Sequence, residues 1–294
     1  MSIFSYVVFV TVVEQKGFIR AADILNITPS AVSHSIAQFE KECGFPLLIR
    51  DKMGTRLTQN GKLILPYVYS ILKSEESLKQ TVTHINGIEK GTVKIGTFSS
   101  VCVNWIPDII KSYHALYPDI EIIVYQGGYT DVVNWLNSSS VDLGFITYPA
   151  PEELDVQCVG RDRFFCVTPP DFQPKNPDSV TMEEFRDMSF ILQRDDYGRE
   201  TYSLIKKHNI NANFQFYVID DQSLVAMVES GLGVCVVPEL VIKQVSANVN
   251  VYPIVPAEYR SIGIARMKNQ PLSPAAEKMY QHIISCASSF ELRK

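Results

Sequence analysis

The chain has 294 residues, 46% hydrophobic and 20% charged, which excludes a disordered or fibrous protein and allows two or three packed domains. Its formal net charge of −5 taken alone argues against nucleic acid, but residues 1–90 carry ten Lys and Arg against eight Asp and Glu. Residues 91–294 carry seventeen against twenty-four, so a mildly basic head is joined to an acidic body, which is compatible with DNA contact at the head alone.

The first thirteen residues are apolar enough to suggest a signal peptide. However, no basic residue precedes the run, Glu14 follows it instead of a small-residue cleavage site, and it is shorter than the roughly 20 residues of a membrane span. We therefore expect a buried first helix, no contact with a membrane and a cytoplasmic location.

Six cysteines are scattered without CxxC or His-rich spacing, so we expect reduced thiols, no metal site and no cofactor. Cys158 and Cys166 are eight residues apart and could be read as a redox pair. Both lie in apolar, strand-like sequence, which favours inert core thiols.

Residues 18–43 predict two helices joined by a tight turn. The small pair Ala21–Ala22 would let the helices cross closely, and Asn26 suits a turn residue with positive φ. Thr28 can cap the second helix, while Pro29 at its first position loses nothing by lacking an N–H. Gly44 is the expected C-cap.

The second helix, residues 29 to about 42, turns an apolar stripe inward and shows short hydrogen-bonding side chains, without an acid, on the opposite face near its start. Such a face suits base edges in a major groove. Residues 47–58 predict two short strands around Gly54, a wing whose cations would contact phosphates. A helical hairpin with a merely solvated polar face is the alternative, but the combination favours DNA binding. The candidate DNA-contacting residues are Arg20, Thr28, Pro29, Ser30, Ser33, His34, Gln38, Arg50, Lys52 and Arg56.

An ordered set of positions runs through this head: Phe18, Ala21-Ala22, Ser30-Ala31-Val32-Ser33, Glu40, Gly44, Leu47, Arg50 and Leu57-Thr58-Gln59-Asn60-Gly61. The set resembles that of the LysR-type transcriptional regulators. The resemblance implies a winged helix-turn-helix that reads double-stranded DNA. Pro29 and His34 replace the Gln and Arg that are frequent at these positions, so the operator preference of relatives does not carry over.

Residues 58 to about 87 predict one long helix. Its apolar positions alternate at spacings of four and three, interrupted at Glu75, and such a heptad seam favours a partner helix. Packing against its own domain is the alternative, disfavoured by the polar opposite side of Lys73, Glu76, Lys79 and Gln80. Pro66 is expected to kink the helix. The seam consists of Ile64, Val68, Ile71, Leu78, Val82 and Ile85.

The body alternates strands and helices. We expect strands at 92–98, 120–125 and 141–147 with helices at 101–117 and 130–136, which form a parallel, doubly wound sheet. A second series follows from about 164 to 262, and the stretch 262–266 with a helix at 274–290 would return to the first lobe. The fold class is therefore α/β: a winged helix-turn-helix (1–58), a linker and dimerisation helix (59–90) and a two-lobed, periplasmic-binding-protein-like effector domain (91–294). Lobe I would span about 91–162 and 266–294, and lobe II about 163–265.

The sensing domain of the same family resembles this layout, on matches at 91–96, 105–107, 117–118, 141–144 and 228–238. Its members bind a small metabolite, often a carboxylate, at strand ends beginning with the position of Ser99. They work as dimers, often as tetramers built from two dimers.

Ligands of such sheets bind beyond the carboxyl ends of strands. There, two serines open a helix whose free N–H groups predict a small-anion site, and two glycines would let backbone approach a ligand. The serines could instead simply cap their helix. The candidate effector-binding residues are Ser99, Ser100, Gly127, Gly128, Thr147 and Gln193.

These features predict a transcription regulator that binds a (pseudo)palindromic operator as a homodimer or homotetramer, responds to a small, anionic effector and acts on RNA polymerase. An enzyme with a DNA-anchoring head is the alternative, opposed by the lack of a nucleophile–base set, a metal cluster or a GxGxxG after a strand. We therefore assign no catalytic residue. A solute-binding protein would need a signal peptide and no head.

Overall fold

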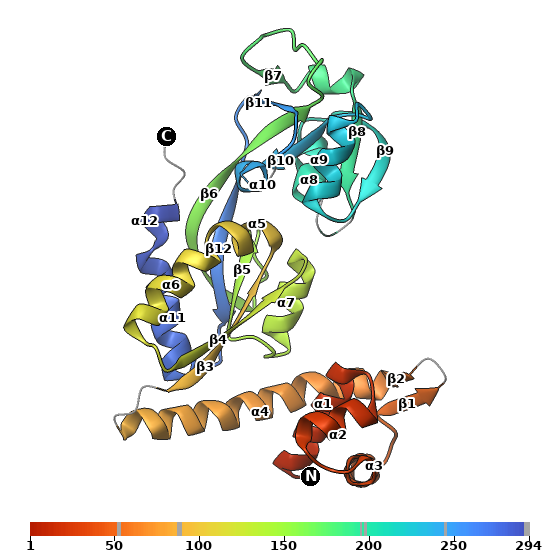
Figure 1. Cartoon of the computed structure of the whole chain (residues 1–294), viewed down its shortest axis with the longest axis vertical. Helices are drawn as coiled ribbons and strands as arrows, with labels where there is room; N and C mark the ends of the chain where they lie inside the picture. Colours follow the sequence, from red (N-terminus) through yellow and green to blue (C-terminus); the bar gives the residue numbers. More distant parts are fainter. Residues whose placement is uncertain (52–53, 87–89, 195, 197–198, 244–245, 291–294) are drawn as a thin grey trace.

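The chain forms three parts, which Figure 1 shows as a small helical head, a long helix α4 along the base of the molecule and two stacked lobes. The computed structural model describes residues 1–51, 54–86, 90–194, 196, 199–243 and 246–290. Each lobe and the head has a hydrophobic core of its own.

The head is the predicted winged helix-turn-helix. Asn26 has a φ of 52° at the turn, Thr28 Oγ1 accepts a hydrogen bond from Ala31 N (3.2 Å), and Gly44 ends the second helix with a φ of 81°. The two wing strands pair antiparallel around Gly54. The elements are α1 (Ile3–Gln15), α2 (Phe18–Leu25), α3 (Pro29–Cys43), β1 (Leu48–Asp51) and β2 (Gly54–Leu57).

The apolar N-terminal run is α1, and it lies in the core of the head. Val8, Phe9 and Val12 are fully buried there, and the Phe9 ring packs edge-on against Phe39 of α3. This confirms the expected buried first helix.

The linker helix α4 (Gln59–Ile85) begins at Thr58, whose hydroxyl accepts a hydrogen bond from Gly61 N (2.9 Å), and continues through Pro66. Its polar side packs against lobe I of the same chain. Lys73 Nζ donates to the carbonyl of Val141 (3.1 Å), and Gln80 Nε2 donates to that of Thr92 (3.2 Å). The expectation that this helix would not pack against its own domain was therefore wrong for its polar side, because these side chains find backbone acceptors in lobe I.

Lobe I is built on five strands, in the order β4-β3-β5-β12-β6, of an eight-stranded sheet that continues into lobe II. Three of the strands are parallel, as expected, but β12 runs antiparallel to both neighbours, so the sheet is mixed. The strands are β3 (Gly91–Thr97), β4 (Ile120–Gln126), β5 (Leu143–Thr147), β6 (Leu154–Thr168) and β12 (Tyr259–Met267).

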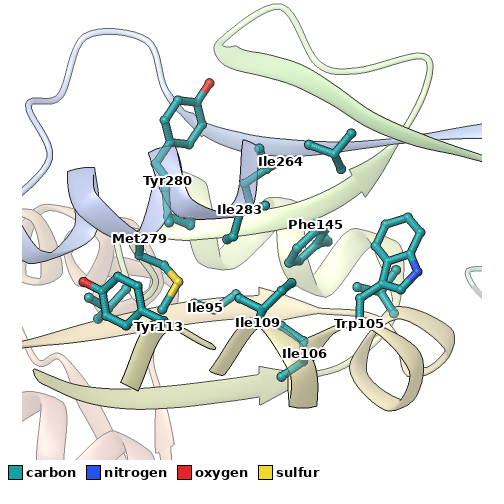
Figure 2. Close-up of a cluster of buried hydrophobic side chains, with 14 of the residues drawn as sticks. Ile95, Trp105, Ile106, Ile109, Tyr113, Phe145, Ile264, Met279, Tyr280 and Ile283 are labelled. Carbon is teal, nitrogen blue, oxygen red and sulfur yellow. The ribbon is translucent and has the colours of Figure 1, made fainter. Parts of the chain in front are cut away.

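The helix expected at 101–117 is two helices that meet at Trp105. Pro107 lies in the first turn of the second helix, where it lacks the N–H that would continue the hydrogen-bond ladder of the first. Figure 2 shows the resulting core, in which the Trp105 indole packs edge-on against Phe145. The helices of lobe I are α5 (Ser99–Asn104), α6 (Ile106–Leu116), α7 (Tyr129–Asn137), α11 (Pro274–Ser285) and α12 (Ala287–Phe290).

Two strands, β6 and β12, run through both lobes and form the crossing between them (Figure 1). Residues 262–265 of β12 pair with β5, so the chain returns to lobe I a few residues before 266. Lobe II adds β7 (Val180–Thr181), η1 (Glu184–Asp187), β8 (Ser189–Gln193), α8 (Arg199–Lys207), β9 (Asn213–Val218), α9 (Asp221–Glu229), β10 (Cys235–Pro238), α10 (Glu239–Ile242) and β11 (Asn250–Val255).

The two cysteines considered as a redox pair lie on the same strand, β6. Cys166 is buried as expected, but Cys158 is exposed. Eight residues of extended strand separate them by roughly 26 Å, since each residue adds about 3.3 Å. They are therefore too far apart to form a disulfide within the chain.

Candidate DNA interface and effector cleft

The predicted recognition face of α3 lies at the surface. Ser30, His34 and Gln38 are exposed and Ser33 is half-buried, while Val32, Ile36 and Phe39 on the other side are buried. The exposed Thr28 and Pro29 form the start of the helix, and Thr28 Oγ1 lies 2.9 Å from Ser30 Oγ. Hydroxyl and imidazole groups are thus presented together near the start of the helix, whereas Gln38 lies about two turns further along and donates to Glu42 Oε1 (2.8 Å).

The predicted phosphate contacts flank this face. Arg20, Arg50 and Arg56 are all exposed, and the Arg50 guanidinium stacks over the Phe18 ring at 3.5 Å from its centroid. Lys52 lies outside the described residues. Stacking on Phe18 fixes Arg50 beside the helix pair.

Glu40 has a positioning role in the head. Its Oε1 accepts hydrogen bonds from the backbone N–H groups of Leu47 (2.7 Å) and Leu48 (3.0 Å). This carboxylate therefore anchors the start of the wing to α3, which gives a physical reason for an acid at that position.

A small, partly open cavity of about 30 Å³ lies between the two lobes, with room for no more than one or two water molecules. Residues of both lobes and of the crossing strands line it. Among the predicted effector residues, Ser99, Ser100 and Gln193 belong to the lining. The full lining is Phe98, Ser99, Ser100, Tyr129, Phe164, Gln193, Glu200, Thr201, Asp221, Pro238, Val241 and Arg260.

Gly127, Gly128 and Thr147 do not belong to this lining within the described part of the chain. A Cβ on Gly127 would lie 2.7 Å from the Trp135 ring, so this glycine permits close packing of α7. Gly128 N donates to Asp131 Oδ2 (2.9 Å) at the start of the same helix, and Thr147 is buried in β5. These three residues lie outside this cavity and serve the packing of lobe I, so their contact with an effector stays a prediction.

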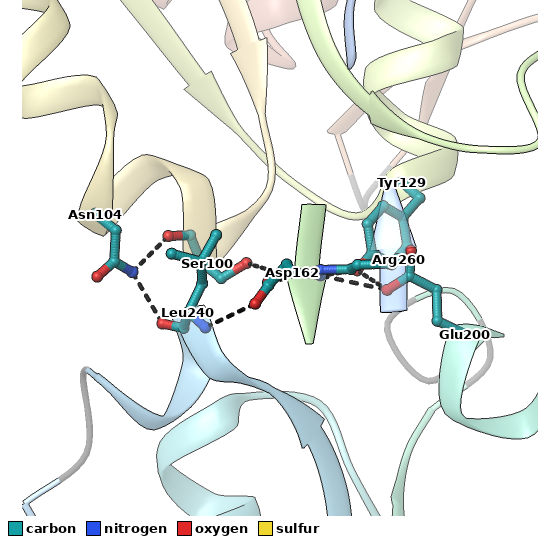
Figure 3. A network of polar contacts seen from close by, with 7 residues as sticks. All are labelled: Ser100, Asn104, Tyr129, Asp162, Glu200, Leu240 and Arg260. Atoms are coloured by element: carbon teal, nitrogen blue, oxygen red, sulfur yellow. Dashed lines mark hydrogen bonds and ion pairs between the residues drawn. The ribbon is translucent and has the colours of Figure 1, made fainter. Parts of the chain in front are cut away.

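Arg260 of β12 is the centre of the cleft, and Figure 3 shows its polar contacts. Its Nε and Nη2 donate to Asp162 Oδ2 (2.9 and 2.6 Å), and Nη2 also donates to Ser100 Oγ (2.7 Å). Its Nη1 donates to Tyr129 Oη (2.8 Å) and lies 3.3 Å from Glu200 Oε2. The guanidinium is nearly buried, and it ties both lobes to the crossing strands.

Burial opposes the charge of Arg260, but Tyr129, Glu200 and Asp162 outweigh it and raise the pKa of the guanidinium above its usual range. Burial also raises the pKa of the Asp221 carboxyl, although hydrogen bonds from Gln193 and Ser99 act in the opposite direction.

Direct contacts between the lobes hold the cleft closed. Tyr129 Oη, from α7 of lobe I, donates to Glu200 Oε2 of α8 in lobe II (2.9 Å). Thr130 donates through its backbone N (2.8 Å) and its hydroxyl (2.6 Å) to Asp196. Asn104 of lobe I donates to the carbonyl of Leu240 in lobe II (2.9 Å). An effector larger than the cavity would have to rearrange these contacts.

The sequence reasoning missed Arg260, Asp162, Glu200 and Asp221. A signal existed for two of them: Arg260 stands beside an alternating apolar strand, and Asp162 precedes the apolar run from Phe164. A charged residue within a strand that is predicted to be buried requires an oppositely charged or hydrogen-bonding partner.

Two family models match consecutive parts of this chain. The bacterial regulatory helix-turn-helix protein, lysR family, matches residues 5–62, and the LysR substrate binding domain matches residues 86–286. No described helix is long and apolar enough to cross a membrane. In the described residues, no group of three or more His, Cys, Asp or Glu could hold a metal ion.

Among similar proteins, the HTH-type transcriptional regulator YvbU of Bacillus subtilis is 29% identical over 241 residues, 82% of each chain. A full-length OxyR variant from Pseudomonas aeruginosa superposes with a TM-score of 0.75 at 20% identity and covers 97% of this chain and 98% of its own. Full-length CbnR in complex with its target DNA gives a TM-score of 0.69 at 17% identity, over 96% of this chain and 99% of its own. The family models, which together span most of the sequence, show that the chain belongs to the LysR family of DNA-binding transcription regulators with an effector-binding domain, and that it is not an enzyme.

Proposed function

We propose that this regulator binds a (pseudo)palindromic operator as a homodimer or homotetramer in the cytoplasm, and that a small molecule in the cleft between the lobes controls it. RNA polymerase is the further partner that the proposal includes. The observation that carries it is the closed cleft, because a ligand that enters must rearrange the contacts between Tyr129, Glu200 and Arg260. A ligand with different affinities for the open and closed arrangements shifts the balance between them.

The apolar seam of α4 supports self-association. Leu78, Val82 and Ile85 are 64%, 50% and 77% exposed, and Ile71 is 40% exposed. The polar side of the same helix is already occupied by lobe I. A heptad-spaced apolar stripe in water favours a second copy of the helix. The first part of the predicted seam, Ile64 and Val68, packs on the head instead.

A dimer with a two-fold axis would present two copies of α3 to half-sites about 34 Å apart. The exposed polar start of α3 and the flanking arginines support contact with bases and phosphates, respectively. Relatives offer a parallel in the CbnR structure, which was solved with its target DNA.

The test begins with selection of binding sites from a random DNA library by the full chain. We expect two related half-sites in inverted orientation, and selection of a single unrepeated site would contradict the proposal. The double variant Leu78→Glu and Val82→Glu should sediment as a smaller species and lose affinity for the paired site. Lys79→Glu, a charge change between them on the same helix, is the matched control.

For the effector, a thermal-shift screen of small metabolites with the full chain should find a compound that raises the melting temperature by mass action. That compound should also change the affinity for the selected DNA in a gel shift. The anionic effector expected from the sequence stays a prediction, which the charges of the lining oppose.

A further inference from the structure

Arg260, the one arginine among the described residues of the cavity lining, already has hydrogen-bond acceptors within the protein. All three nitrogens of Arg260 donate hydrogen bonds, to Asp162, Tyr129, Ser100 and Glu200. An anionic ligand at this guanidinium would have to displace carboxylates that the chain itself supplies. Burial of the displaced carboxylates would then oppose binding.

Lobe II brings two carboxylates to the same cavity. Glu200 Oε1 is buried and accepts no hydrogen bond from the described residues, while Oε2 is held by Tyr129 and Arg260. Asp221 Oδ1 accepts a hydrogen bond from Gln193 Nε2 (2.7 Å). An unpartnered buried carboxylate oxygen is costly, and a donor from a ligand would remove that cost.

The charge balance of the site is therefore negative. Arg260 forms ion pairs with Asp162 and Glu200, and Asp221 of the lining adds a third carboxylate, which leaves a formal charge of −2. Such a site repels carboxylates and phosphates, and it attracts cations.

Three aromatic rings, of Phe98, Tyr129 and Phe164, complete the lining. Two of these rings already attract cations of the protein. The Arg260 guanidinium lies 5.1 Å from the Phe98 ring centroid, and Arg199, which is exposed and not part of the lining, lies 5.6 Å from that of Tyr129. Aromatic faces combined with carboxylates are the groups that bind organic ammonium ions.

We propose that the effector is a small organic cation, an amine or guanidine, whose charged group is held by Glu200 and Asp221 and whose carbon chain lies against Phe98, Tyr129 and Phe164. This inference rests on the proposed role of the cleft as the effector site. The cation supplies the hydrogen-bond donor that Glu200 Oε1 lacks. It also draws Glu200 toward the ligand at the expense of the contact with Tyr129, which couples binding to the arrangement of the lobes.

The experiment measures the melting temperature of the full chain with matched probes: butylamine, 1,4-diaminobutane and agmatine as cations, and butyrate and succinate as anions. The wild type is compared with Glu200→Gln and Asp221→Asn, which keep the size of the side chain. Glu183→Gln, at an exposed glutamate of lobe II away from the cleft, is the control. A cation at about tenfold above its dissociation constant should raise the melting temperature by roughly 3–6 °C in the wild type and the control. Asp221→Asn serves as the second variant should Glu200→Gln fail to fold.

The shift should be lost in Asp221→Asn and in Glu200→Gln and kept in Glu183→Gln. The proposal is overturned if none of the cations raises the melting temperature, or if a cation raises it equally in Asp221→Asn and in the wild type. If only the anionic probes, butyrate and succinate, raise the melting temperature, the proposed ligand class is also wrong. The cleft would still be an effector site if the same anionic probe also changes the affinity for DNA. Failure of every metabolite to act on DNA binding would instead count against the proposed function itself.

Discussion

Replacing Arg260 with methionine removes the cation around which the cleft is built, while it keeps a long apolar stem. Asp162 is fully buried, and it would keep the hydrogen bond from Leu240 N (3.2 Å) but lose both hydrogen bonds from the guanidinium. Breaking a buried ion pair by removal of one partner costs about 3–5 kcal/mol of unfolding free energy, because the other charge stays buried and uncompensated. For a domain of this size that cost corresponds to a drop in melting temperature of roughly 6–20 °C.

The matched control is Arg266→Met on the same strand. Arg266 also contacts two carboxylates, Asp155 (2.9 Å) and Glu277 (3.2 Å), but all three side chains are partly exposed. Exposed ion pairs contribute about 0–1 kcal/mol, so this variant should melt within a few degrees of wild type. The comparison separates the loss of a buried charge pair from the loss of an arginine stem.

The assay is urea unfolding followed by tryptophan fluorescence. The chain has two tryptophans, Trp105 and Trp135, and both lie in lobe I, so the signal reports the domain that contains the network. The double variant Arg260→Met with Asp162→Asn should recover part of the loss, since the uncompensated charge is gone. If Arg260→Met destabilises no more than Arg266→Met, the reasoning about the buried network is refuted.

Three further predictions concern single side chains. Ser33→Glu places a carboxylate on the recognition face and should weaken DNA binding by roughly ten- to a hundredfold in gel shifts, whereas Ser74→Glu on the exposed side of the linker should not; equal affinities would refute the assignment of α3. Asp221→Asn should melt higher than wild type at about pH 8, because burial raises the pKa of the Asp221 carboxyl and the ionised form is unfavourable in the folded state. That advantage should shrink as the pH is lowered and the Asp221 carboxyl of the wild type takes up a proton; a difference that stays constant with pH would contradict the assigned direction. Gly127→Ala should cost about 1–3 kcal/mol and shift the fluorescence of Trp135, since the new methyl group meets the ring; an unchanged unfolding midpoint would show that the helix yields freely.

Local signals in the sequence were enough to predict the head. The turn at Asn26, the cap at Thr28 and the stop at Gly44 each depend on a backbone preference of one residue, and the structure confirms all three. The apolar positions of α3 follow directly from a helical period. Elements of this kind are determined within a few residues along the chain.

The effector cleft depends on contacts between residues far apart in the sequence. Arg260 meets Asp162 across 98 residues and Ser100 across 160. No helical or strand periodicity within a short stretch of sequence predicts such a pairing. The strands that bring these residues together, β6 and β12, were predicted only in part, because each strand runs through both lobes and packs on a different core in each. Ser99 and Ser100 were found since they begin a helix at a strand end, but the charges opposite them come from other elements.

The closed cleft and the exposed apolar seam of α4 are connected through lobe I. Ser99, Asn104, Tyr129 and Thr130 of lobe I make direct polar contacts with lobe II, whereas β6 and β12 join the lobes covalently. Rotation about the two strands can therefore separate the lobes at the cost of these hydrogen bonds, each worth about 1 kcal/mol net, and of the packing of Leu240 on the core of lobe I. Lobe I is fixed to α4 through Lys73 and Gln80. A ligand that favours the open arrangement thus moves lobe II relative to the linker helix and the DNA-binding head. Through that movement, binding in the cleft can change the contacts with a second subunit.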